Sequence, residues 1–232
     1  MGKINFKRIT YKLNVDLANS GLVVDSFGNA SARTNENTFC IKPTGARLNE
    51  INFNDISEVD FEGKVISGLK PSSDTPTHSE IYKAFDDVGG IIHSHSPYAT
   101  AWAQAKLEIP CLGTTHADYL QGSIPITREL KTNEIRSEYE KETGKVIIEK
   151  LKKIAISPLK CPGILVSSHG PFCWGVSIED ALKNAIRLEY LAKIAFLTIS
   201  INPKINNLGQ SLHNKHFLRK HGADAYYGQD SD

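Results

Sequence analysis

Apolar positions recur along the chain at two spacings, which predict helices alternating with short strands. Phe6, Ile9, Leu13 and Leu17 lie on one face of a helix that Gly21 would end. Further helices are expected at 75–85, after 96–97, at 133–154 and at 177–201. The first of these would have residue 75 as its N-cap, and 143–144 is the point at which the third could break.

Short apolar runs predict strands at 37–43, 56–61, 64–67, 109–113, 122–127 and 163–168, and 89–90 leads into another that carries His93 and His95. The turn at 62–63 has hairpin chemistry, which indicates antiparallel pairing there. We expect an α/β sandwich. Because no repeat, low-complexity tract or proline-rich linker divides the chain, residues 1–232 are expected to form one domain with a tail from about 202.

Composition and charge narrow the class of protein. The chain has 232 residues, of which 40% are hydrophobic, so a sizeable core can form; 27 basic and 26 acidic residues leave a formal charge of +1. This balance predicts no nucleic-acid or membrane partner, so an anion must bind at a local site. Without an apolar stretch of membrane-spanning length, a signal peptide or paired cysteine spacing, we expect a cytoplasmic protein with reduced cysteines in its core.

Three histidines have the most specific pattern. His93 and His95 are two residues apart at the end of an apolar strand, so both imidazoles point to one side. Hydrogen bonding between them would explain that pair equally well. His169 follows a separate apolar strand, however, and three imidazoles predict a divalent metal site that leaves one coordination position for substrate.

Two loops have the composition of an anion site. Residues 42–45 follow a predicted strand, and residues 70–74 lead into a predicted helix; both combine lysine, hydroxyl groups and free N–H groups. Ordinary turns and caps use the same residue types, so each loop alone is weak evidence. Residues 28–31 are weaker still.

A series of motifs resembles the L-ribulose-5-phosphate 4-epimerases of the class II aldolase and adducin family. The motifs lie at 28–31, 41–45, 70–78, 93–95, 113–119, 138–144, 168–172 and 219–229, and thus cover almost the whole chain. The resemblance implies a three-layer α/β/α sandwich with a central, largely antiparallel sheet. It also implies a Zn2+-dependent homotetramer with active sites between subunits, to which the tail at about 202–232 contributes. Mn2+, Co2+ or Ni2+ would also suit three imidazoles.

The resemblance assigns roles to individual residues. Asp118 and Tyr227 match an acid/base pair, one for each face of the substrate aldehyde, with Tyr227 supplied by a neighbouring subunit. The metal group would be His93, His95 and His169, with Asp74 as the acidic residue near the ion. The other candidates are Asn29, Lys42, Thr44, Gly45, Ser72 and Ser73 for phosphate, and Thr114, Glu140, His216 and Arg219 as supporting residues at the subunit boundary.

The chemistry of such an epimerisation follows from the sugar. In a 2-ketose 5-phosphate the C2 carbonyl does not acidify the C4 hydrogen, so direct proton removal is unfavourable. Cleaving the C3–C4 bond gives an enediolate, whose charge a metal can stabilise, and glycolaldehyde phosphate. Rotation of the aldehyde and re-addition invert C4. This route needs a Lewis acid, a phosphate anchor and acid/base groups on both faces of the aldehyde.

The expected function is conversion of L-ribulose 5-phosphate, an intermediate of arabinose, ascorbate and related pentose routes, to D-xylulose 5-phosphate. A sugar-phosphate aldolase similar to the fuculose-phosphate aldolases is the first alternative, but those enzymes carry Glu where this chain has Asp74. A non-catalytic binding module similar to adducin is the second. Retention of all three histidines and Asp74 argues against it.

Overall fold

The computed structural model describes residues 5–47, 50–223 and 225–227. The protein is built around a sheet of seven strands in the order β4-β3-β2-β1-β5-β7-β6, in which each strand is antiparallel to its neighbours. The strands are β1 (Gly28–Arg33), β2 (Thr38–Ile41), β3 (Ser57–Asp60), β4 (Val65–Ser67), β5 (Gly90–Ser94), β6 (Gly163–Val166) and β7 (Gly170–Gly175).

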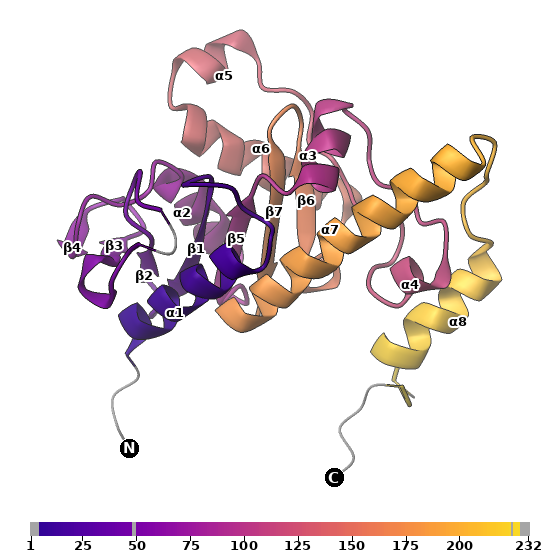
Figure 1. Ribbon diagram of the computed structural model, residues 1–232, viewed down its shortest axis with the longest axis horizontal. Coiled ribbons are helices and arrows are strands. Elements are labelled where there is room, and N and C mark those ends of the chain that lie inside the picture. Colours follow the sequence, from indigo (N-terminus) through magenta and orange to yellow (C-terminus); the bar gives the residue numbers. More distant parts are fainter. Residues whose placement is uncertain (1–4, 48–49, 224, 228–232) are drawn as a thin grey trace.

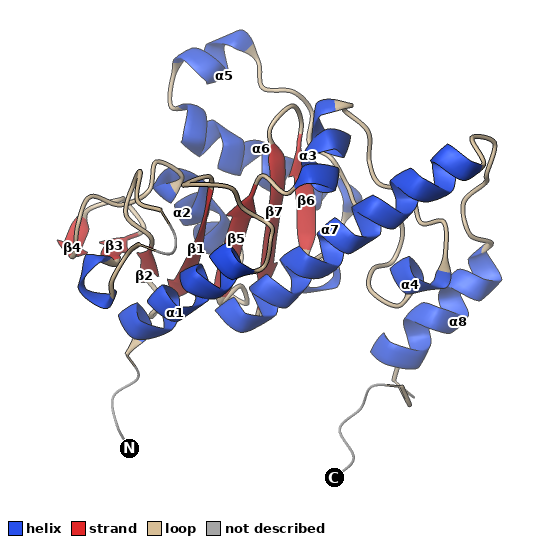
Figure 2. Cartoon of the chain, in the orientation of Figure 1, coloured by secondary structure: helices blue, strands red, loops and turns tan. Residues whose placement is uncertain are grey.

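Helices cover both faces of this sheet (Figure 1, Figure 2). α1 (Phe6–Asn19) and α7 (Ile178–Ile201) cross one face, while α2 (Thr75–Ala84) and α6 (Tyr139–Ile154) pack against each other on the opposite face. The expected three-layer α/β/α sandwich with an antiparallel central sheet is therefore confirmed.

Shorter helices complete the molecule. α3 (Pro97–Gln104) packs on α7 and β7, and α4 (Thr114–Ala117) packs on α8 (Gln210–His221). α5 (Thr132–Arg136) precedes α6. Two 3-10 helices of one turn each, η1 (Phe53–Asp55) and η2 (Pro158–Lys160), are present among the described residues. Within the described residues, none of these helices has the length and apolar content needed to cross a membrane.

The first helix forms where the apolar spacing predicts it. Leu13 and Leu17 are buried, and the side chain of Asn5 caps the helix by accepting the backbone N–H of Arg8 at 3.1 Å. Asn14 lies among the apolar residues of this face because it binds the backbone of β1: its Nδ2 donates to the carbonyl of Ala30, and its Oδ1 accepts the N–H of the same residue. A polar side chain thus fixes α1 on the centre of the sheet.

Two interior strands of the sheet, β1 and β7, were not expected from the sequence. β1 is built mostly of small residues, and β7 begins with Gly170-Pro171, so neither has the branched apolar composition of an ordinary strand. Small residues are required there because neighbouring backbone comes close. A Cβ on Gly28 would lie 2.9 Å from the carbonyl oxygen of His93, and one on Gly170 would lie 2.9 Å from that of Ser94.

Two predicted strands, at 109–113 and 122–127, are wrong as strands of the sheet. They form isolated bridges, Ile109 with Ile124 and Ile126 with Leu165. Pro110 and Pro125 interrupt these runs, and a proline has no N–H to donate to a ladder. The two runs are held by a few backbone hydrogen bonds, such as those that Ile109 and Ile124 exchange, rather than by a continuous ladder.

The helix break expected at 143–144 is also wrong, since α6 runs through both residues and the break lies at 137–138, between α5 and α6. Gly144 is buried against α2, where a Cβ would lie 2.7 Å from the Cβ of Glu80 and 3.1 Å from the carbonyl oxygen of Thr77. This glycine permits the two helices to approach closely, so its role is packing rather than turning.

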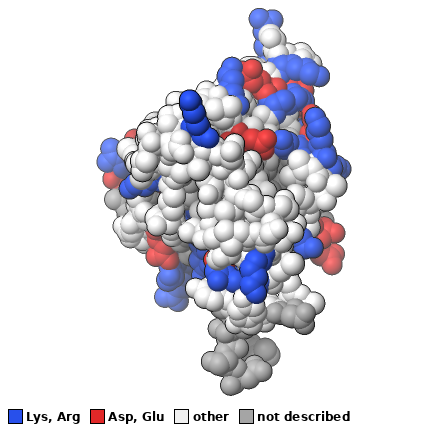
Figure 3. Space-filling model, turned by 90° about the vertical axis from the view of Figure 1, so that its right-hand side faces the viewer, with Lys and Arg blue, Asp and Glu red and all other residues white. Residues whose placement is uncertain are grey.

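The end of the molecule that carries the C-terminal half of α7 and α8 has a broad face with little charge at its centre (Figure 3). Several large apolar side chains are exposed on these elements and the loop between them, namely Phe196, Leu197, Ile201, Ile205 and Leu212. An exposed apolar surface of this kind is typical of a site of association with another protein surface.

Candidate functional site

The three predicted histidines come together at one end of the central strands. Each offers a ring nitrogen, and the three nitrogens lie within 4.8 Å of one another. His93 is the fourth residue of β5, and His95 follows the end of that strand. His169 was expected at the end of a strand but lies in the tight turn between β6 and β7, where Ser168 has a left-handed backbone with φ 61° and the N–H of His169 donates to the carbonyl of Val166.

The ring of His93 is fixed by the strand beside it. Its Nδ1 donates to the carbonyl oxygen of Pro171 at 3.0 Å, and Phe172 stacks on the ring with centroids 4.1 Å apart. Because Nδ1 carries the proton, Nε2 is left with a free lone pair, and it lies 3.1 Å from Nε2 of His95. Two ring nitrogens therefore converge on one point.

This donor set fits a divalent metal ion. Two nitrogens held at about 2.0–2.1 Å from a tetrahedral zinc ion are about 3.4 Å apart, close to the separation of His93 and His95. Burial lowers the pKa of His169 to about 3 and also lowers the pKa of His95, in both cases with a further contribution from His93. Neutral imidazoles, the form that binds metals, are thus present at neutral pH.

Asp74 lines the same cavity as the three histidines. Among the described residues, however, its carboxylate does not belong to the group of ligand atoms that lie within 4.8 Å of one another. Asp74 occupies the N-cap position of α2, which was expected to be Thr75, yet its side chain makes no capping bond. Instead its Oδ2 accepts a hydrogen bond from Nδ2 of Asn29 at 2.7 Å. Burial acts to raise the pKa of Asp74, but His93, His78 and the Asn29 amide together lower it. The carboxylate is ionised and held in place.

A cavity of about 330 Å³ joins the histidines to both predicted anion loops. Lys42, buried at 2% exposure, donates from Nζ to the carbonyl oxygens of Ala46 at 2.6 Å and Ser26 at 3.3 Å, and burial lowers its pKa to about 8. The N-terminus of α2 also opens here. The candidate residues that line this cavity are Asn29, Lys42, Thr44, Gly45, Ser72, Ser73, Asp74, His93, His95, Glu140 and His169.

Tyr139 is a lining residue that was not singled out from the sequence. Its hydroxyl lies 3.4 Å from Nδ1 of His169. The start of α6 that carries it is tied to α2 by a hydrogen bond from Oγ1 of Thr77 to the carbonyl of Glu140. The motif at 138–144 was the available signal, but it drew attention to Glu140 alone. Glu140, expected at a subunit boundary, contributes to the histidine cavity of its own chain.

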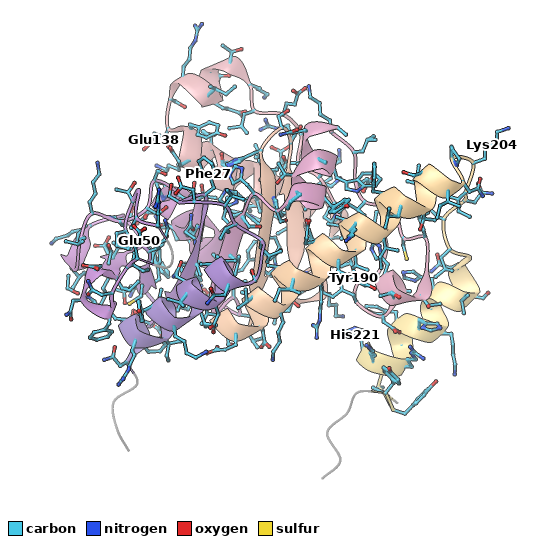
Figure 4. All side chains as sticks on the ribbon, in the orientation of Figure 1. Phe27, Glu50, Glu138, Tyr190, Lys204 and His221 are labelled. Atoms are coloured by element: carbon cyan, nitrogen blue, oxygen red, sulfur yellow. The ribbon has the colours of Figure 1, made fainter. Side chains whose placement is uncertain are left out.

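The proposed acid/base pair lies elsewhere in the chain. Asp118, just after α4, and Tyr227 line a separate cavity of about 510 Å³ that shares no residue with the first. Figure 4 shows the separation: Phe27, on the histidine cavity, and Tyr190 and His221, on the second cavity, lie at distant points of the ribbon. A single chain does not bring Asp118 to the histidines.

Asp118 is held by two residues of α8. Its Oδ1 accepts from Nδ1 of His216 and Nε of Arg219, each at 3.0 Å, and its Oδ2 accepts from a terminal nitrogen of Arg219 at 2.7 Å. Partial burial acts to raise the pKa of Asp118, but these two partners lower it. The guanidinium of Arg219 in turn lies 4.3 Å from the ring centre of Tyr227, which is half-exposed.

The supporting residues are thus divided between the two regions. His216 and Arg219 contact Asp118, and the carbonyl of Thr114 accepts the N–H of Asp118. Of the C-terminal motif at 219–229, residues 224, 228 and 229 lie outside the described part of the chain.

The comparisons with known proteins agree with this architecture. Residues 10–196 match the family model described as the Class II Aldolase and Adducin N-terminal domain. An L-fuculose 1-phosphate aldolase is similar with a TM-score of 0.76 and 23% identity over 93% of this chain and 96% of its own. The L-fuculose-1-phosphate aldolase of Thermus thermophilus has a TM-score of 0.65 and 22% identity over 89% and 100%.

YgbL of Klebsiella pneumoniae, whose description leaves aldolase, epimerase and decarboxylase as open alternatives, has a TM-score of 0.73 and 25% identity over 92% of this chain and 99% of its own. The family match includes the sheet, the three histidines and Asp118, and ends before α8. Over most of its length, therefore, this chain belongs to the class II aldolase and adducin family.

Proposed function

We propose that the protein catalyses the C4 epimerisation of L-ribulose 5-phosphate to D-xylulose 5-phosphate, by cleaving and re-forming the C3–C4 bond. The observation that carries this proposal is the state of Asp74. The side chain of Asp74 is one carbon shorter than the glutamate of the similar fuculose-phosphate aldolases, and the hydrogen bond from Asn29 holds it in place, so its carboxylate reaches less far toward the reacting atoms of the substrate. A reaction on this site then needs acid/base groups from elsewhere, and Asp118 with Tyr227 are such groups.

The first cavity is suited to bind a phosphorylated sugar at both ends. His93, His95 and His169 would hold a divalent ion, with Zn2+ as the proposed metal and Mn2+, Co2+ or Ni2+ as alternatives. When bound, the ion supplies positive charge to offset the negative charge that cleavage develops on the sugar oxygens. At the other end, Lys42, with hydroxyls and N–H groups of the two loops, would bind the phosphate.

The acid/base steps are assigned to the second cluster. Asp118, ionised beside Arg219 and His216, accepts the proton of the C4 hydroxyl as the C3–C4 bond breaks. The aldehyde then turns within the cavity. On re-addition, Tyr227 donates a proton to the aldehyde oxygen from the opposite face, and the C4 configuration is inverted.

These steps require a second copy of the chain, because the two cavities share no residue. We assign Asp118 and Tyr227 to the histidine cavity of a neighbouring subunit in a homotetramer. The face with little charge at its centre, at the end of α7 and on α8, supports association, since Ile201, Leu212 and their neighbours are exposed on these elements. The tail from about 202 would then complete a neighbour's site.

The direct test is a coupled assay for D-xylulose 5-phosphate formed from L-ribulose 5-phosphate by the purified protein. Activity should disappear on chelation and return when Zn2+ is added. Accumulation of glycolaldehyde phosphate without the epimer would replace the proposal with the aldolase alternative. Absence of turnover with stoichiometric zinc bound would contradict both reactions on this substrate.

A sugar-phosphate aldolase is the second candidate, and the specific observation in its favour is the similarity to L-fuculose 1-phosphate aldolases. It would use the same histidines and phosphate loops. Cleavage of L-fuculose 1-phosphate at a rate above that of epimerisation would establish it.

A further inference from the structure

A row of polar contacts joins β1 to α2 behind the histidine cavity. Asn29 and Ser31 are two residues apart on a strand, so both side chains point to the face that α2 covers. Asp74, His78 and Tyr82 are four residues apart and line one face of the helix. The two sets meet as Asn29 with Asp74, and Ser31 with both His78 and Tyr82.

The inner part of this row is fully enclosed. Ser31, His78 and Tyr82 each have 0% exposure. Oγ of Ser31 lies 2.7 Å from Nδ1 of His78 and 2.8 Å from the hydroxyl of Tyr82. The other ring nitrogen of His78, Nε2, has no hydrogen-bond partner among the described residues. A buried polar group without a partner is costly, so the direction of each hydrogen bond matters.

Counting donors selects one direction for the bonds. If Tyr82 donates to Ser31 and Ser31 donates to Nδ1 of His78, every hydroxyl proton is used and Nε2 of His78 carries the ring proton. If instead Nδ1 carries the proton and donates to Ser31, either the hydroxyl of Tyr82 or that of Ser31 is left without an acceptor. The first arrangement leaves one buried group without a partner, and each alternative leaves two.

We propose that Tyr82 and Ser31 fix His78 as the neutral tautomer protonated on Nε2, and that this N–H, which makes no hydrogen bond of its own among the described residues, favours the ionised and oriented carboxylate of Asp74 through its dipole. His78 is thus a positioning residue. The inference deepens the proposed function and rests on it for its effect on catalysis, but not for the tautomer itself.

The placement of His78 supports this role. It lies one helical turn after Asp74, and side chains on a helix lean toward the N-terminus, which here is the Asp74 end. Nδ1 is turned to β1, so Nε2 is on the opposite side of the ring. His78 and Asp74 interact electrostatically, and burial lowers the pKa of His78 to about 3, so the ring is neutral throughout the working range of pH.

Asp74 is then restrained from two sides. The amide of Asn29 donates to Oδ2 from β1, and on this proposal the imidazole of His78 adds a fixed dipole from within α2. A carboxylate restrained in this way keeps its charge and its orientation toward the histidines. The consequence is that Asp74 serves as a fixed charge while proton transfer is left to other groups.

The tautomer can be measured directly in the full-length, zinc-loaded protein. Nitrogen-15 NMR of the histidine rings, with His78 assigned by its absence in His78→Gln, should show the proton of His78 on Nε2. In Tyr82→Phe and Ser31→Ala the preference for the tautomer protonated on Nε2 should weaken, because each substitution removes a hydroxyl from the hydrogen bonds that join Tyr82, Ser31 and His78. Ser57→Ala is the matched control, since Ser57 is another buried strand serine that donates to a backbone carbonyl, of Leu69.

A ring proton on Nδ1 of His78 in the wild-type protein would overturn the proposal. So would an unchanged tautomer of His78 in both Tyr82→Phe and Ser31→Ala. These outcomes do not depend on which sugar phosphate is turned over, so they are separable from failure of the proposed function. Circular dichroism and bound zinc identify variants that do not fold. If either Tyr82→Phe or Ser31→Ala does not fold, the other variant and the wild-type spectrum still decide which nitrogen of His78 carries the proton.

Kinetics test the positioning role. Tyr82→Phe keeps the ring and its packing on Phe61, and we expect kcat to fall about 10-fold with KM little changed, because the phosphate loops are untouched. His78→Gln, which retains an N–H donor, should keep more activity than His78→Leu at equal bound zinc. Equal losses in these two variants, or a change in KM alone, would contradict positioning of Asp74 by an N–H group.

Discussion

The histidine cavity and the cavity at Asp118 hold their carboxylates in opposite ways. Asp74 is buried between β1 and α2, and its direct hydrogen-bond donor is the neutral side chain of Asn29. Asp118 lies nearer the surface and is paired with the cationic side chain of Arg219 and with His216. The first depends on the central strands, and the second on a helix that packs on α4. On the proposed function, the buried carboxylate of Asp74 would act as a fixed charge, and that of Asp118, nearer the surface, would exchange a proton with the substrate.

The largest expected effect concerns the histidine cavity. His95→Ala should lose its metal and at least about 1,000-fold in turnover, because the positive charge needed for bond cleavage is lost. Metal analysis and the epimerase assay give the two readings. His221→Ala, a histidine of the second cavity, is the control and should keep its metal. Full activity with unchanged metal in His95→Ala would remove His95 from the site.

A mixture of two inactive variants tests whether the cavities of different subunits combine. His95→Ala and Asp118→Asn, unfolded and refolded together in equal amounts, should recover about a quarter of wild-type activity, because about one site in four joins two intact halves in a repeating interface. His95→Ala mixed with His169→Ala should recover none. Recovery in the second mixture, or none in the first despite mixed oligomers, would contradict sites shared between subunits.

Tyr227→Phe removes one hydroxyl of the second cluster. We expect turnover to fall about 100-fold with fold and metal content unchanged, since proton transfer by a placed side chain contributes at least this factor. Tyr226→Phe is the matched control because Tyr226 is the adjacent exposed tyrosine, and its rate should be normal. Equal rates for the two variants would remove Tyr227 from the mechanism.

Lys42 should show the smallest effect, which depends on pH. Burial lowers its pKa to about 8, from 10.5 for an ordinary lysine, so its positive charge is present below that pH and lost above it. We expect kcat/KM to decline as pH rises through about 8. Lys42→Met should reduce kcat/KM about 10-fold at neutral pH, as expected for a lost charge-assisted hydrogen bond, and should abolish this decline. Lys70→Met is the control and should keep the decline of kcat/KM above a pH of about 8. If Lys42→Met also kept this decline, the decline would belong to another group.

The parts predicted well from the sequence have local signals. The strand that leads to His93 and His95 follows from its apolar run and the helix at 75–84 from its Thr-Pro start, and both form, although His95 lies just beyond the strand and Thr75 is not the N-cap. β1 was missed because its small residues weaken the strand signal, and β7 because it starts with Gly170-Pro171; Gly28 and Gly170 are needed where neighbouring backbone comes close. Gly144 was assigned to a break for the same reason, since its contact with α2 is not visible in sequence.

The division of the candidate site into two cavities could not be predicted from spacing. It depends on where α4 and α8 pack relative to the sheet, which is a property of the folded chain. Nor did the sequence indicate the position of Asp74, because Thr75 was the expected cap, whereas Asp74 occupies the N-cap position and its side chain makes no capping bond. In both cases the deviation from the local rule lies at a residue with a proposed role in catalysis.

The packing of α8 bears on how such a reaction could diversify. His213 and Phe217 are the buried residues of this helix, so the segment that carries His216 and Arg219 has little apolar burial and is held to the rest of the chain largely by polar contacts with Asp118. On the proposed function, evolution could replace or alter this segment and so change which product forms after the sugar is cleaved. The histidine cavity and its phosphate loops would stay unchanged. Catalytic novelty would then arise at the periphery of the protein, where substitutions are tolerated best.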